Sequence, residues 1–346
     1  MSLSRVLVDG NGEQGVRIED PGASNAGIAV AIHNSTISNN GFSVSDADGV
    51  FVGESGAGSV HVALNGSQLT GNGADGVEID ESGDGSIVFT ATGSIFEGNG
   101  SQDPGDLEDG MDFDEAGEGD LVVELKNVSI RENSQQGIDA DEAEGGEVNF
   151  RIVNSEGADH PEEGLSIREE GDGDTVIDFI ASVFSGNGIP ADDDGEPQQT
   201  VDCEEADDGD LVVHVVNSDF TNTGDDGLKV DELDGGNLSV DIKNAHFDAN
   251  ADRGVDLTEE GEGNLEANLV NVSISDNGKD GLRSRENDGG DLAVDVTNAS
   301  INGNTNDAVE IQQNDAGDGL VVLTQVQIAG NGDDTPDVSG ADLIEK

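Results

Sequence analysis

The chain has 346 residues, and its 77 acidic residues against 13 Lys and Arg give a formal charge of −64 at pH 7. That charge excludes a nucleic-acid surface, because binding DNA requires cationic groups that displace counterions, and it disfavours docking on anionic lipid. The favoured partners are cations, or else the medium is very salty and screens the crowded carboxylates.

No stretch is long and apolar enough to insert into a membrane, and no signal peptide precedes the first repeat. The only cysteine, Cys203, excludes an internal disulfide and falls at an apolar repeat position, where we expect a buried, inert thiol. We expect an extracellular or cell-surface location, as an excised segment of a longer protein. The alternative is the cytoplasm of a salt-accumulating organism, because the acidic composition is of the halophilic type.

A repeat of 27 residues runs from Val6 to Gly332, and one copy of it extends from Asp210 to Gly236. Positions 2, 4 and 6 of each copy are apolar, as in Leu211, Val213 and Val215. Alternation with period two predicts a half-buried strand.

Two further strands follow in each repeat. Position 11 is large and apolar, as in Phe220, and predicts a second, short strand. Positions 19 and 21 are apolar again, as in Leu228 and Val230, and predict a third. Three strands without an intervening helix predict a coil whose strands pair in parallel with those of the next coil, about 4.8 Å away.

Asparagine recurs at positions 8 and 14 of the repeat. We expect both sets to point inward and to stack amide on amide along the axis. Glycine recurs at position 18, where the third strand begins after a sharp turn. The position 8 residues are Asn127, Asn154, Asn217, Asn244, Asn271 and Asn298, and those at position 14 are Asn72, Asn99, Asn133, Asn187, Asn250, Asn277, Asn304 and Asn331.

The segments Asn72 to Val77 and Asn277 to Leu282 share the pattern N-G-x-D-G-V/L, in which x is a variable residue. They resemble the right-handed parallel β-helix of the pectate-lyase-like fold. The resemblance implies an all-β, right-handed three-sheet parallel β-helix of about eleven coils, a solenoid forming a single domain over residues 1–346. It says little about activity, since that fold serves lyases, hydrolases, epimerases, tailspikes and adhesins.

A column of glutamates occupies position 23 with gaps of 27, 34, 27, 27, 36, 27, 27 and 27 residues. Like charges 4.8 Å apart repel by about 0.9 kcal/mol even at the dielectric constant of water, so something must offset the repulsion. Three explanations remain open: high salt, bound Ca²⁺ as the one cofactor considered, and capping of the following turn by each carboxylate. The column begins at Glu54, and its candidate metal ligands are Glu81, Glu115, Glu142, Glu169, Glu205, Glu232, Glu259 and Glu286.

Three repeats carry an insertion at the same corner, in loops at 41–48, 100–109 and 188–199. Between the last two loops, Gly157 and His160 replace the usual apolar residue and asparagine. We expect a shallow cleft there, with Asp159, His160 and Glu162 as weak catalytic candidates on its floor. The alternative is that acidic loops merely decorate an acidic solenoid. Further candidate metal ligands in the loops are Asp103, Asp106, Asp192, Asp193 and Asp194.

The sequence disfavours an enzyme without excluding one. No arginine belongs to the cleft, as a pectate lyase would require, and the chain has no Trp or Tyr on which sugar rings could stack. We therefore expect a non-enzymatic acidic β-helix rod that acts in adhesion, structural spacing or cation binding. The alternative is a calcium-dependent polysaccharide lyase, hydrolase or epimerase using the cleft near His160. End-to-end self-association through exposed strand edges is a further expectation.

Overall fold

The computed structural model describes residues 1–22, 24–43, 46–102, 107–189, 197–314 and 316–346. These residues form parallel strands joined by turns, and they divide into two compact units, Met1–Gly173 and Asp174–Lys346. Within the described part of the chain, no helix has the length and apolar character needed to cross a membrane.

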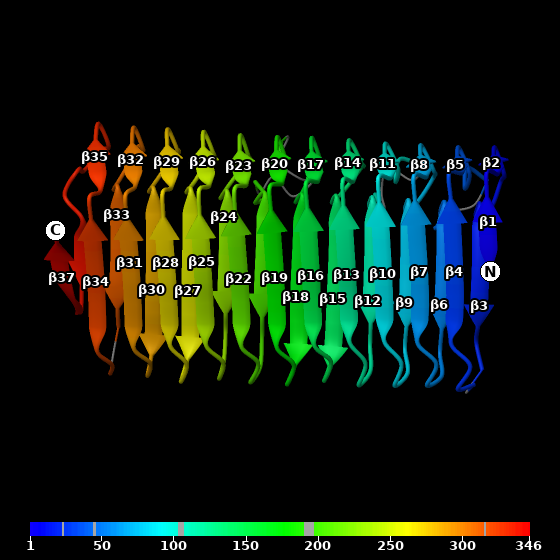
Figure 1. Cartoon of the computed structure of the whole chain (residues 1–346), viewed down its shortest axis with the longest axis horizontal. Helices are drawn as coiled ribbons and strands as arrows, with labels where there is room; N and C mark the ends of the chain where they lie inside the picture. Colours follow the sequence, from blue (N-terminus) through cyan, green and yellow to red (C-terminus); the bar gives the residue numbers. More distant parts are fainter. Residues whose placement is uncertain (23, 44–45, 103–106, 190–196, 315) are drawn as a thin grey trace. The chain divides into compact units, whose positions relative to one another are not determined.

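In the first unit each coil gives one strand to each of three parallel sheets, A, B and C, and the strands of a sheet follow one another in chain order (Figure 1). Sheet A holds β1 (Ser2–Ser4), β4 (Ile28–His33), β7 (Val60–Asn65), β10 (Ile87–Thr92), β13 (Leu121–Lys126) and β16 (Val148–Val153). Sheet B holds β2 (Leu7–Asp9), β5 (Thr36–Ser38), β8 (Gln68–Thr70), β11 (Ile95–Glu97), β14 (Ser129–Arg131) and β17 (Glu156–Ala158). Sheet C holds β3 (Val16–Asp20), β6 (Val50–Glu54), β9 (Val77–Glu81), β12 (Met111–Glu115), β15 (Ile138–Glu144) and β18 (Leu165–Gly171).

The second unit repeats this arrangement with its own strands of the same three kinds. Those of sheet A are β19 (Thr175–Ile180), β22 (Leu211–Val216), β25 (Leu238–Lys243), β28 (Leu265–Val270), β31 (Leu292–Thr297), β34 (Gly319–Thr324) and β37 (Ala341–Glu345). Those of sheet B are β20 (Val183–Ser185), β23 (Asp219–Thr221), β26 (His246–Asp248), β29 (Ser273–Ser275), β32 (Ser300–Asn302) and β35 (Gln327–Ala329). Those of sheet C are β21 (Val201–Glu205), β24 (Leu228–Glu232), β27 (Val255–Gly261), β30 (Leu282–Asp288), β33 (Val309–Gln313) and β36 (Asp337–Ser339).

The fold is a right-handed three-sheet parallel β-helix, as the sequence predicts. Equivalent repeat positions pair in register, so that Leu211 of β22 faces Leu238 of β25 and Leu238 faces Leu265 of β28. All three side chains are fully buried. The predicted alternation of sheet A and the three strands of each repeat are therefore confirmed.

Stacked side chains fill the interior. The rings of Phe184, Phe220 and Phe247 follow one another at centroid distances of 6.0 and 5.3 Å with nearly parallel planes. Cys203 is buried on β21, which confirms its predicted burial, and burial raises the pKa of its thiol well above the ordinary value.

The asparagines at position 14 form the expected inward ladder. Asn99 Oδ1 accepts hydrogen bonds from the backbone N–H of Asn72 at 3.1 Å and from its side-chain Nδ2 at 3.0 Å. Asn99 Nδ2 in turn donates to Asn133 Oδ1 at 3.0 Å and to the carbonyl of Leu69 at 3.2 Å. The ladder thus satisfies buried backbone groups as well as its own amides.

The asparagines at position 8 do not point inward, which corrects the expectation from the sequence. Asn244 and Asn271 are exposed, and Asn271 Nδ2 donates to Asn244 Oδ1 at 3.0 Å on the outside of the corner. Their backbone has φ of 54° and 58°, in the left-handed region that asparagine tolerates better than most residues. The corner, rather than the core, selects asparagine at this position.

The glycine at position 18 is required by space. At Gly110 a Cβ atom would lie 2.5 Å from the carbonyl oxygen of Gly137 and closer still to Asn133 Nδ2. The glycine therefore leaves room for the asparagine ladder, and its φ is not in the left-handed region.

The ladder predicts a large difference between the two asparagine columns. We expect Asn99→Ala to lower the free energy of unfolding by about 2–3 kcal/mol, because it leaves buried backbone and amide groups without partners. The control Asn271→Gly keeps a residue suited to positive φ and should change stability by less than about 0.5 kcal/mol. Urea unfolding in high salt measures both, and equal effects would contradict the role given to the ladder.

Candidate functional site

The column glutamates lie at the end of the sheet C strands and point inward, where their side chains are 0–1% exposed. Glu232 Oε1 accepts hydrogen bonds from the backbone N–H of Asp234 at 3.3 Å and of Gly236 at 2.9 Å. The turn-capping explanation is therefore confirmed. The same kind of bond to the following turn is made by Glu54, Glu81, Glu115, Glu142, Glu205, Glu259 and Glu286.

Neighbouring glutamates of the column also interact with one another. Burial, followed by the hydrogen bonds that its carboxyl group makes with Glu142 and Glu81, raises the pKa of Glu115 to about 10. Burial, and after it the charges of Glu232 and Glu286, raises the pKa of Glu259 to about 8. Members of the column therefore keep protons at neutral pH, and the like-charge repulsion is smaller than full ionisation would give.

The contacts of the column carboxyls are with turn N–H groups and with neighbouring carboxyls. Metal binding by these glutamates stays a prediction. Gln313 occupies the same repeat position after Glu286, in register with it. Its Nε2 donates to the carbonyl of Gly290 at 3.0 Å, so that an amide serves where a protonated carboxyl would otherwise donate.

The catalytic candidates of the fifth repeat do not share one environment. His160 is fully buried, and its Nδ1 accepts the backbone N–H of Asn133 at 3.3 Å, so that it takes an asparagine's place in the ladder. Burial lowers the pKa of His160 to about 4. Asp159 is exposed with φ of 62°, and Glu162 is half-buried. Their catalytic role stays a prediction.

The loop acids Asp103, Asp106, Asp192, Asp193 and Asp194 lie outside the described residues. Their role as metal ligands stays a prediction.

A second set of acids covers the outer face of sheet C in the first unit. We call it the acid grid, and it is made of paired positions on β9, β12 and β15. Asp112 faces Glu78 on one side and Asp139 on the other, and Asp114 likewise faces Asp80 and Asp141. The grid comprises Glu78, Asp80, Asp112, Asp114, Asp139 and Asp141.

The grid is electrostatically costly. Burial raises the pKa of Asp112 to about 8, with further contributions from the charges of Asp114 and Asp139. Burial also raises the pKa of Glu78 to about 10, with Asp48 as the next cause. Carboxyls with such pKa values gain from any cation that comes to lie between them.

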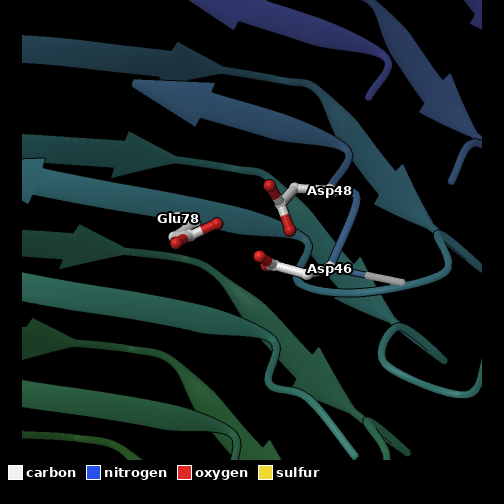
Figure 2. A group of neighbouring side chains, drawn as sticks. All are labelled: Asp46, Asp48 and Glu78. Atoms are coloured by element: carbon white, nitrogen blue, oxygen red, sulfur yellow. The ribbon is translucent and has the colours of Figure 1, made fainter. Parts of the chain in front are cut away.

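A corner loop brings one more acid to the grid. Carboxylate oxygens of Asp46, Asp48 and Glu78 lie within 4.8 Å of one another (Figure 2). The sequence did not predict this cluster, because Asp46 belongs to the insertion at 41–48 and Glu78 to the following repeat. The available signal was the pair Asp46 and Asp48 at a corner, followed one repeat later by Glu78 at an outward position.

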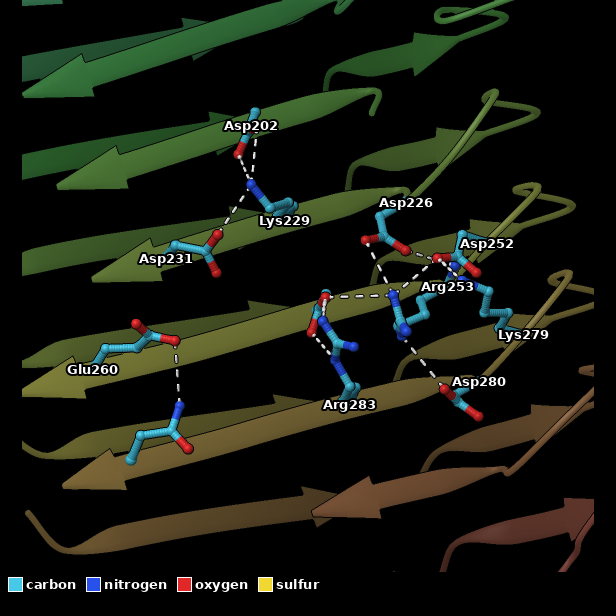
Figure 3. A network of polar contacts seen from close by, with 12 residues as sticks. Asp202, Asp226, Lys229, Asp231, Asp252, Arg253, Glu260, Lys279, Asp280 and Arg283 are labelled. Carbon is cyan, nitrogen blue, oxygen red and sulfur yellow. Dashed lines mark hydrogen bonds and ion pairs between the residues drawn. The ribbon is translucent and has the colours of Figure 1, made fainter. Parts of the chain in front are cut away.

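In the second unit the same positions carry bases between the acids (Figure 3). Lys229 Nζ lies 3.1 Å from Asp202 Oδ1 and 3.0 Å from Asp231 Oδ2. Arg283 pairs with Asp256, which lies one coil away. Lys229 and Arg283 therefore form ion pairs between coils, whereas in the first unit Arg168 of β18 faces Asp141 at the edge of the grid.

Arg253 neutralises several aspartates at once (Figure 3). Its guanidinium lies 2.9 Å from Asp252, 3.4 Å from Asp280, 3.6 Å from Asp256 and 3.7 Å from Asp226. A second cluster of three acids, Asp225, Asp226 and Asp252, has oxygens within 4.8 Å of one another and lies beside this arginine.

Comparison with known proteins adds little beyond the fold. No family model matches the chain, and a search of curated proteins found no match. Among solved structures, the A-module of the mannuronan C-5 epimerase AlgE6 from Azotobacter vinelandii is similar, with 13% sequence identity and a TM-score of 0.37. The match covers 92% of this chain and 91% of that module.

The glutamate column predicts an unusual dependence of stability on pH. A carboxyl whose pKa is raised by folding stabilises the protein most below its unfolded value, and the contribution is lost as pH rises toward the folded value. In dilute buffer we therefore expect the free energy of unfolding to fall between about pH 5 and pH 9.

The variant Glu115→Gln tests this directly, because a glutamine donates without a titrating proton, as Gln313 does. It should raise the free energy of unfolding at pH 8 by about 1 kcal/mol and flatten the pH dependence. Glu118→Gln makes the same substitution at an exposed position outside the column and should leave the slope unchanged. A steeper slope in Glu115→Gln would show that the column is ionised in the native state.

Proposed function

We propose that this chain is a non-enzymatic acidic β-helix of a surface or secreted protein, acting in adhesion or structural spacing, whose acid grid binds Ca²⁺. The observation that carries the proposal is the contrast between the units. The first unit stacks acid on acid at the positions where the second places Lys229 and Arg283 between aspartates.

A divalent cation suits the grid for two reasons. Its groups are carboxylates about 4.8 Å apart along the stacking direction, the oxygen ligands that Ca²⁺ prefers. One Ca²⁺ between two carboxylates also replaces their repulsion by attraction, as the ammonium of Lys229 does between Asp202 and Asp231. The same chemistry allows bridging to an anionic partner surface, which supports the role in adhesion.

The environment of His160 supports the non-enzymatic part of the proposal. A buried imidazole that already accepts a backbone N–H through Nδ1 is a poor candidate for proton transfer to a solvent-borne substrate. The absence of Trp and Tyr from the sequence also disfavours a sugar-binding groove.

Calcium should stabilise the protein beyond its effect on ionic strength. We expect CaCl₂ to raise the melting midpoint by several degrees more than NaCl of equal ionic strength, measured by circular dichroism. An equal rise with both salts would contradict specific binding and leave only screening of a halophilic-type surface.

A lysine side chain placed in the acid grid should replace the bound Ca²⁺. The variant Asp112→Lys places an ammonium between Glu78 and Asp139, as Lys229 lies between Asp202 and Asp256 in the register of β24. We expect a higher midpoint without calcium and a smaller calcium increment. Glu118→Lys makes the same change of charge on an exposed turn and should keep the full increment. A larger increment in Asp112→Lys would count against the grid.

A screen against uronan polymers checks the absence of catalysis. With calcium present we expect no absorbance from new double bonds, no new reducing ends and no change in the ratio of epimeric sugars. Formation of any of these products would contradict the proposal if it is lost in His160→Asn, a variant that keeps an amide in the ladder. The protein would then be an enzyme.

A further inference from the structure

The corner loop at 41–48 places Asp46 and Asp48 beside Glu78, a member of the acid grid. Asp46 is exposed and has φ of 57°, which turns the chain back toward the sheet. Asp48 follows at the entry to β6, and Glu78 lies on the outer face of β9. Figure 2 shows the three carboxylates directed toward a common space, with oxygens within 4.8 Å of one another.

One buried carboxylate oxygen in this cluster accepts no N–H group. Asp48 is fully buried, and its Oδ1 accepts the backbone N–H of Asp75 at 3.2 Å, whereas no N–H group of the described residues donates to its Oδ2. The Asp48 carboxylate also shares a side-chain hydrogen bond with Glu78, whose pKa burial and the charge of Asp48 raise to about 10, so that a proton joins the two groups when no cation is bound. A buried carboxylate oxygen beside two further carboxylates requires a cation or a proton to be satisfied.

Among the described residues no base forms an ion pair with this cluster. The guanidinium of Arg17 is paired with Glu19 and lies 4.5 Å from the ring centroid of Phe51, and the hydrogen bond to Glu19, followed by the charges of Glu19, Asp48 and Glu78, raises its pKa. The next two coils add the buried acids Asp75 and Asp109.

The counterpart of Asp48 in the second unit, Asp226, has a base beside it. Asp226 Oδ1 accepts the backbone N–H of Arg253, as Asp48 Oδ1 accepts that of Asp75, and Arg253 Nη1 lies 3.7 Å from Asp226 Oδ2. The first unit therefore has an acid, Asp75, at the position where the second unit has the base Arg253.

We propose that Asp46, Asp48 and Glu78 form a Ca²⁺ site at this corner. It rests on the proposed function, and deepens it by naming one bound ion with its ligands. The ligands are all oxygens, two from the corner loop and one from β9. Such a set suits Ca²⁺, which accepts irregular geometry, better than Mg²⁺, which demands a small octahedral shell. Water molecules complete the coordination.

Calorimetric titration of the whole chain with CaCl₂ in 0.5 M NaCl tests the site, because this salt screens diffuse binding to the exposed acids. We expect a class of one ion per chain. Asp46→Asn should weaken that class by about tenfold or more, and asparagine tolerates the positive φ, so folding should be unaffected.

The variant Glu78→Lys provides a test that misfolding cannot imitate. Its ammonium would replace the ion beside Asp48, so we expect a higher melting midpoint without calcium and no binding in the one-ion class. The matched control Asp225→Asn removes one acid from the cluster that already has Lys279 and Arg253, and should bind calcium as the unaltered chain does. MgCl₂ should bind more weakly than CaCl₂.

The outcomes separate this site from the proposed function. If Asp46→Asn and Glu78→Lys bind calcium as tightly as the unaltered chain, the site is wrong, whereas calcium stabilisation through the grid can still hold. If calcium stabilises the unaltered chain no more than matched NaCl, the proposed function fails as well. Equal affinity for Mg²⁺ would overturn the assignment to Ca²⁺.

Discussion

The hydrogen bonds between successive coils are the constraint on which the rest of this molecule depends. Parallel pairing in register places every side chain beside its equivalent from the neighbouring repeat, as Leu211, Leu238 and Leu265 show. For apolar residues and asparagines this is favourable, because like groups pack or bond well with like groups. For acids it is unfavourable, and a chain with 77 of them must deal with the consequence at many positions.

The chain meets this difficulty in different ways at different positions. In the glutamate column, burial and close carboxyl neighbours hold protons in place, while turn N–H groups stabilise the oxygens that remain charged. On the outer face of the second unit, Lys229 and Arg283 separate the acids. In the acid grid of the first unit burial also raises the pKa of Glu78 and Asp112, but β9, β12 and β15 carry no base, and Arg168 of β18 faces only Asp141 at one edge. This shortage of bases is the physical basis for proposing Ca²⁺ there.

The sequence predicted the fold because the period is visible in almost every class of residue, and a period fixes both strand order and register. It also predicted the buried thiol of Cys203 and the inward asparagine ladder. It failed at Asn244 and its equivalents, because strict recurrence does not distinguish an inward column from an outward corner. It missed Asp46, Asp48 and Glu78 because an insertion separates the acids in sequence that the corner unites in space.

In the second unit the sign of the charge at one outward position alternates from each repeat to the next. At the outward position of sheet C the sequence reads Asp202, Lys229, Asp256, Arg283 and Glu310, so that acid and base alternate. Loss of the single repeat that contains Asp256 would preserve every backbone pairing and the glutamate column, yet would set Lys229 against Arg283. Loss of two adjacent repeats would restore the alternation. Gain or loss of repeats in this part of the gene should therefore favour pairs, although backbone pairing alone would allow single repeats.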